Sequence, residues 1–136
     1  NISALINGIG GSINYRDPSW QGFEGEDLIA TIDLGKEQII NHIKVRFLQD
    51  QVVWIFLPKL IQIEYSTDGI NFELAYEFYP DNSFSYDQDI FEYSVALNNI
   101  ESRYVRIKGL NINECPDFHP GAGGPSWVFA DEIIIK

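Results

Sequence analysis

Apolar residues alternate with polar ones along most of this chain, and this period of two limits its fold more than any other feature. Between residues 39 and 47, the apolar Ile43, Val45 and Phe47 alternate with polar or charged neighbours. The pattern recurs at 30–34, 61–66, 91–97 and 104–108, and 128–135 is a mostly apolar strand. Alternation is typical of half-buried strands, and no segment has a capped helical stripe. Seven or eight short strands without alternating helices predict a β-sandwich or jelly roll.

The composition indicates one folded domain with neutral or cationic ligands. The chain has 136 residues, 45% of them hydrophobic, which suffice for one core and leave little room for a second. The 20 acidic and 9 basic side chains give a formal net charge of -11. Because nucleic acid and anionic membrane lipid would be repelled, we expect neither as a partner.

The sequence lacks the motifs of common catalytic centres. It has two histidines, and neither a Gly-x-Ser-x-Gly elbow, a His-Glu-x-x-His motif, a P-loop nor a dinucleotide fingerprint is present. The single cysteine, Cys115, excludes an internal disulfide and a cysteine-based zinc cluster. Neighbouring acids such as Asp131 and Glu132 could serve a glycosidase, but adjacent acids are more often solvated surface. We therefore expect a domain without catalytic activity.

Three interruptions of the strand pattern, at 7–27, 49–59 and 111–127, carry aromatic side chains in long or proline-containing segments. Long loops on a rigid sheet are common binding sites. Aromatic rings stack on the C–H faces of sugars, and a few polar side chains fix the hydroxyls. Alternatively, the rings plug an open end of the sandwich. If Trp54 and Trp127 line a concave polar pocket, sugar binding is favoured; if they form a flat apolar patch, a protein interface is favoured. The candidate sugar-binding residues are Arg16, Trp54, Phe56, Phe118, His119 and Trp127.

The glycine-rich segment 4–12 could form a cation site. Calcium needs six to eight oxygens from side chains and tightly turned backbone. Here glycines allow carbonyls to converge, and Asn7 and Ser12 add side-chain oxygens. An acid from the last strand, Asp131 or Glu132, would balance the charge. The alternative is that these residues only form turns.

Six signatures in a fixed order make the chain resemble a known family. They are Ala4-Leu5-Ile6-Asn7-Gly8 followed by Ser12, then Trp20, Ile32-Asp33-Leu34-Gly35-Lys36, Ser66-Thr67-Asp68-Gly69, Arg103-Tyr104-Val105-Arg106-Ile107 and Asp131-Glu132-Ile133. Together they resemble the discoidin domain, or coagulation factor type C domain, in its bacterial carbohydrate-binding branch. Residues 54–59 and 119–124, followed by Trp127, look like the C-terminal domain of bacterial chitobiase-type β-N-acetylhexosaminidases.

The resemblance implies an all-β, eight-stranded jelly-roll sandwich of the galactose-binding-domain-like type. It also implies one domain over residues 1–136, excised from the C-terminal part of a larger bacterial protein that is secreted, periplasmic or on the outer cell surface. The domain would be a non-catalytic module binding a glycan beside its parent glycoside hydrolase domain. The alternative is a structural domain that packs on the catalytic domain or mediates oligomerisation.

The resemblance also implies a structural calcium site. Carried over by position, its ligands would be the carbonyls of Ala4 and Ile9, the side chain of Asn7, Ser12, and Glu132 of the last strand. The family usually has Asp where this chain has Asn7, and the missing negative charge weakens the hold on the cation.

Overall fold

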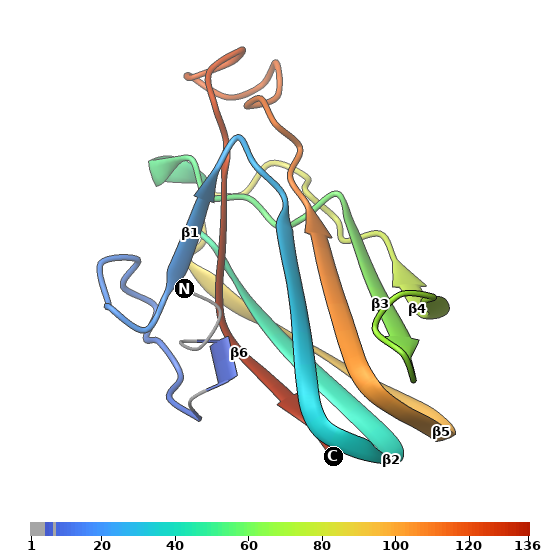
Figure 1. Ribbon diagram of the computed structural model, residues 1–136. Coiled ribbons are helices and arrows are strands. Elements are labelled where there is room, and N and C mark those ends of the chain that lie inside the picture. Colours follow the sequence, from blue (N-terminus) through green and yellow to red (C-terminus); the bar gives the residue numbers. More distant parts are fainter. Residues whose placement is uncertain (1–4, 7) are drawn as a thin grey trace.

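The computed structural model describes residues 5–6 and 8–136, and its long elements are all β-strands (Figure 1). The strands are β1 (Gln21–Glu24), β2 (Leu28–Gln49), β3 (Leu60–Ser66), β4 (Glu73–Phe78), β5 (Asp89–Leu110) and β6 (Trp127–Ile135), and the short 3-10 helix η2 (Gln51–Val53) follows β2. Every strand pair is antiparallel, in the order β1-β6-β2-β5-β3-β4. The all-β prediction is confirmed. No helix in the described ranges is long and apolar enough to cross a membrane.

Two long bent strands, β2 and β5, belong to both layers of the fold (Figure 1). They pair from Leu28↔Gly109 to Gln49↔Asp89, with register shifts between Asp33 and Gln38 and again after Ile40. The second half of β2 continues the sheet to β6 and β1, whereas the second half of β5 continues it to β3 and β4. Counting both halves of β2 and β5 gives four strands in each layer. The expected eight-stranded arrangement is therefore built from six continuous strands.

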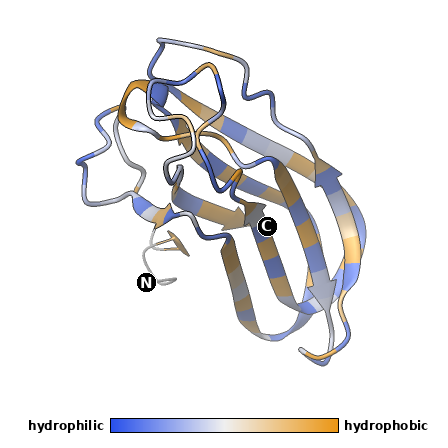
Figure 2. Cartoon of the chain, turned by 90° about the horizontal axis from the view of Figure 1, so that it is seen from above, coloured by the Kyte–Doolittle hydropathy of each residue, from blue (hydrophilic) through white to orange (hydrophobic). Residues whose placement is uncertain are grey.

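The predicted segments 30–34 and 39–47 are joined in β2 because the strand bends without losing its partner. Irregular pairing of this kind bends a strand and changes which side chains face inward. Before the bend Leu28, Ala30 and Ile32 are buried, at even positions, and after it Ile43 and Val45 are buried, at odd positions. Figure 2 shows the resulting alternation of hydrophobic and hydrophilic residues along the strands. The core lies between the layers, and a smaller cluster of Trp20, Leu48 and Ile55 lies beside it.

Candidate functional site

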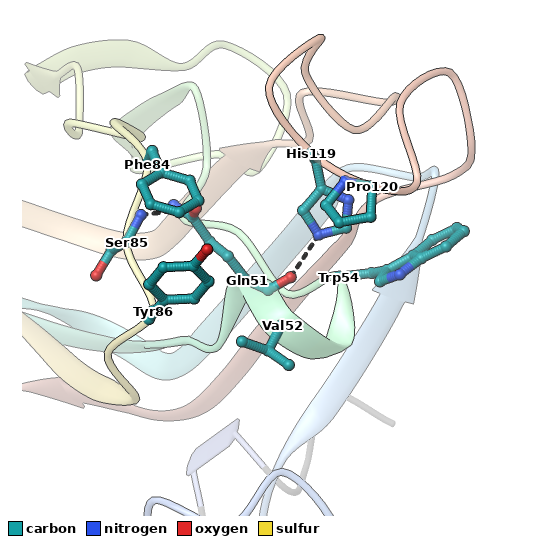
Figure 3. A pocket seen from close by; sticks show the side chains of 8 residues that line it. All are labelled: Gln51, Val52, Trp54, Phe84, Ser85, Tyr86, His119 and Pro120. Atoms are coloured by element: carbon teal, nitrogen blue, oxygen red, sulfur yellow. Dashed lines mark hydrogen bonds between the residues drawn. The ribbon is translucent and has the colours of Figure 1, made fainter.

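Three segments meet at one end of the sandwich around a hollow of about 140 Å³, which we call the first hollow (Figure 3). They are the turn around η2, the 79–88 segment between β4 and β5, and the 111–126 segment before β6. The hollow is lined by Gln51, Val52, Trp54, Phe84, Ser85, Tyr86, His119 and Pro120. No Asp, Glu, Lys or Arg side chain of the described residues is among them, so its wall is mainly apolar and carries no fixed charge.

Gln51 and His119 hold the three segments together. The buried Gln51 amide donates to the Ser83 carbonyl at 2.8 Å and accepts the Ser85 N–H at 3.1 Å. His119 Nδ1 accepts the Gly121 N–H at 2.9 Å, which places the ring proton on Nε2. Nε2 therefore donates to the Gln51 carbonyl at 2.6 Å (Figure 3). Because these polar groups are used internally, they fix the shape of the hollow.

Trp54 is held in an unusual backbone conformation. Its φ of 70° and ψ of 21° lie in the left-handed region, which bulky residues rarely adopt. Its N–H donates to the Gln51 carbonyl at 3.0 Å, and its carbonyl accepts the Trp127 N–H at 2.9 Å. The indole lies on Gly121 and Gly124, where an added Cβ would come within 2.4 Å and 2.7 Å of ring atoms. Trp54 as a residue is 36% exposed, so its orientation is set while part of it remains accessible.

The 79–88 segment supplies two aromatic rings that our sequence analysis missed. Phe84 and Tyr86 are 52% and 76% exposed and pack edge to face, with ring centroids 4.6 Å apart. Phe118 packs against Phe84 at 5.7 Å and extends this aromatic wall. Three aromatic residues, Tyr79, Phe84 and Tyr86, in a segment otherwise rich in Ser, Asp and Asn were the available signal.

A second hollow, of about 260 Å³, lies on the other side of η2. Val53 of η2 borders it, whereas Val52 and Trp54 border the first hollow. It is lined by Tyr15, Val53, Ile55, Trp127 and Phe129. The two tryptophans expected in one site therefore lie in two adjacent hollows.

Comparison with known families identifies the family to which this architecture belongs. The model of the F5/8 type C domain matches residues 2–126. The chain belongs to the F5/8 type C domain family. No curated protein matches it in sequence. The family predicted from the ordered signatures is thus confirmed.

Solved structures show the same fold as this F5/8 type C domain. The module CpGH89CBM32-6 of Clostridium perfringens has a TM-score of 0.60 at 19% identity, over 98% of this chain and 82% of that one. The C-terminal domain of a chitobiase from Bacteroides fragilis has a TM-score of 0.55 at 16% identity, over 100% and 79%. A mutant of chitosan-binding module 1 from a Paenibacillus sp. IK-5 chitosanase/glucanase has a TM-score of 0.59 at 17% identity, over 97% and 96%. The jelly-roll prediction is confirmed.

The six predicted sugar-binding residues of the F5/8 type C domain occupy three places. Trp54 and His119 line the first hollow, and Phe118 extends its wall. Trp127 lines the second hollow, and Arg16 stacks on Tyr15 beside it. Phe56 is fully buried, with its ring 5.4 Å from that of His119. The prediction that Phe56 contacts a ligand is corrected, because the residue supports His119 from inside. The hollows are concave, as expected for a sugar site, but mainly apolar, as expected for a protein interface.

Of the predicted calcium ligands, Ala4 and Asn7 lie outside the described residues. Ile9 and Ser12 lie in the exposed first loop, and Glu132 is half-buried in β6. The Ser12 carbonyl accepts the Trp20 indole N–H at 2.7 Å. No group of three His, Cys, Asp or Glu side chains that could hold a metal ion occurs within 5–6 and 8–136.

The acid that contacts the first loop is Asp131. It is fully buried, and its Oδ2 accepts the Gly11 N–H at 2.6 Å and lies 3.4 Å from Arg46 Nη2. Its Oδ1 is buried and has no hydrogen-bond partner in the described structure. Burial raises the pKa of Asp131, and the negative charge of Glu132 acts in the same direction. A buried carboxylate oxygen without a partner beside a glycine-rich loop fits a hard cation such as calcium.

Proposed function

We propose that this domain is a non-catalytic carbohydrate-binding module that holds an uncharged sugar ring in the first hollow. The observation that carries the proposal is a concave, uncharged wall formed by Trp54, Phe84 and Tyr86. The left-handed backbone and glycine support of Trp54 give its ring a fixed orientation before any ligand arrives, and such strain is concentrated at functional sites. The Ser85 and Tyr86 hydroxyls are polar groups that could meet sugar hydroxyls.

The parent protein in this proposal is a glycoside hydrolase of the chitobiase or β-N-acetylhexosaminidase type. It would be a bacterial protein that is secreted, periplasmic or on the outer cell surface, and this module would follow its catalytic domain. The support is the shared fold with a chitobiase C-terminal domain and with a chitosan-binding module. A site for one sugar unit binds at about 1 mM, or about −4 kcal/mol. Tethering to the catalytic domain would then keep the enzyme near its glycan.

Trp54→Ala is expected to abolish measurable glycan binding by the first hollow. Removing the ring deletes the largest flat surface, and we expect affinity to fall at least about tenfold, or about 1.4 kcal/mol. The measurement is calorimetric titration with N-acetylglucosamine, galactose and chitooligosaccharides. Tyr79→Ala is the matched control, since Tyr79 is 68% exposed and lines neither hollow. Equal affinities of wild type and Trp54→Ala for every sugar bound would contradict the proposed site.

A protein interface is the second candidate for the same surface. Val52, Phe84 and Phe118 are 61%, 52% and 46% exposed, and apolar rings are common anchors in interfaces. In that case the rings would be covered by the parent catalytic domain or by another copy. Binding of a sugar to the isolated domain, with loss on Trp54→Ala, separates the two functions.

We also propose that a calcium ion ties the first loop to β6, near Asp131 and Glu132. Calcium at 100 times its dissociation constant is expected to stabilise the fold by about 2.7 kcal/mol and to raise the melting temperature by several degrees. Glu132→Ala should remove this calcium-dependent increase, whereas Glu92→Ala, in the exposed pair with Lys44, should preserve it. Identical melting curves of the wild type with calcium and with chelator would contradict the proposal.

A further inference from the structure

The second hollow differs from the first in having an arginine beside it. Tyr15 and Phe129 pack edge to face at 6.5 Å, and Trp127 packs on Phe129 at 5.7 Å. The guanidinium carbon of Arg16 lies 5.4 Å from the Tyr15 ring centroid, and its Nε donates to the Tyr15 hydroxyl at 3.2 Å. An aromatic wall and a cation therefore lie side by side.

The absence of a side chain at Gly22 allows two rings of the second hollow to pack against β1. Gly22 of β1 pairs with Phe129 of β6. A Cβ on Gly22 would lie 2.8 Å from a Phe129 ring atom and 3.0 Å from a Trp127 ring atom. Both rings thus lie against the β1 backbone, and Trp20, Leu48 and Ile55 support this region from behind.

Arg16 is the one arginine of the described structure that has no carboxylate partner. Arg46, Arg103 and Arg106 pair with Asp131, Asp33 and Glu64, respectively. The adjacent Asp17 forms no ion pair with Arg16; its two oxygens instead accept the N–H groups of Ser12 and Ser19 at 2.9 Å and 3.0 Å. In a chain with a net charge of -11, an exposed arginine without an acidic partner is notable.

We propose that the second hollow binds an anionic sugar residue, whose ring lies on Trp127 and Tyr15 and whose carboxylate or sulfate pairs with Arg16. The planar guanidinium presents paired N–H donors that match such an oxyanion. The net charge of the domain disfavours polyanions, so the ligand is a glycan with an isolated acidic residue. This inference rests on the proposed glycan binding and assigns the neighbouring unit of that glycan to the second hollow.

The experiment compares charged and neutral sugars by NMR of the 15N-labelled domain, which has three tryptophan indole signals. Glucuronate is titrated against glucose, and N-acetylglucosamine 6-sulfate against N-acetylglucosamine. We expect the Trp127 indole signal to shift with one or both anionic sugars, with an affinity at least about tenfold above the neutral counterpart. The preference should weaken at about 0.5 M salt, because salt at this concentration strongly screens the attraction between Arg16 and the anionic group. The two pairs distinguish carboxylate from sulfate.

Arg16→Gln should remove the preference for the anionic sugar, and Arg16→Lys should keep only part of it. Arg16 is exposed, so neither variant should disturb the fold. An equal response to charged and neutral sugars, or a preference that survives Arg16→Gln, would overturn the inference. The outcome for the first hollow is separate, because that hollow is read from the Trp54 signal with neutral sugars. A Trp127 response without any Trp54 response would support the second hollow and contradict the first.

Discussion

Asn111→Asp is expected to destabilise the domain by about 4 kcal/mol or more at pH 7, which is among the largest effects of one substitution. Asn111 is fully buried. Its Nδ2 donates to the carbonyls of Phe23, Glu26 and Ser126 at 3.0 Å, 3.0 Å and 3.2 Å. A carboxylate at position 111 has no N–H group to donate to these three carbonyls. It would also place a negative charge next to their oxygens. Each buried group without a partner costs about 1–3 kcal/mol, and the buried charge adds to this.

Urea unfolding of Asn111→Asp and of Asn98→Asp measures this effect. Asn98 is exposed in β5, so the same chemical change there should stay within about 0.5 kcal/mol. Asn111 begins the segment that carries His119 and Pro120, two residues that line the first hollow. Unfolding of Asn111→Asp should therefore also remove the first hollow. Similar unfolding midpoints and slopes for both variants would show that Asn111 does not hold this segment.

Asp131→Ala is expected to cost about 3–5 kcal/mol, because it breaks a buried pair and leaves Arg46 without its partner. The Gly11 N–H loses its acceptor as well, so the first loop is released from β6. For a domain of this size the melting temperature should fall by roughly 10 °C. Thermal melting in the presence of chelator gives the effect without any contribution from calcium.

The control for Asp131→Ala is Glu92→Ala, which breaks the exposed pair with Lys44. Exposed pairs contribute about 0–1 kcal/mol, so this variant should melt close to the wild type. Equal melting temperatures of the two variants would contradict the role of Asp131 in joining the loop to the last strand.

The strands were predictable from sequence because alternation reports the two faces of each strand directly. The continuity of β2 was not, since the bend depends on register shifts against β5. The choice between Asp131 and Glu132 has the same origin. Val45 pairs with Ile133 and Phe47 with Ala130, so an advance of two residues along β2 matches an advance of three along β6. This bulge decides which of the two acids faces the first loop.

The site was predictable in its residue types but only partly in its arrangement. Trp54 and His119 were identified because aromatic residues in long or proline-containing segments are common in binding sites. Phe56 was misplaced because two residues of one segment can face opposite ways, and packing decides which one is buried. Phe84 and Tyr86 were missed because the 79–88 segment meets the other two only in the folded chain.

The most direct test of the central claim is the Trp54 indole signal during titration of the 15N-labelled domain with neutral glycans. The account predicts that N-acetylglucosamine, galactose or a chitooligosaccharide shifts this signal saturably. The Trp20 signal should stay fixed, since Trp20 is buried and its indole N–H is bonded to the Ser12 carbonyl. An unchanged Trp54 signal across the whole series, up to tens of millimolar sugar, would contradict a sugar site in the first hollow.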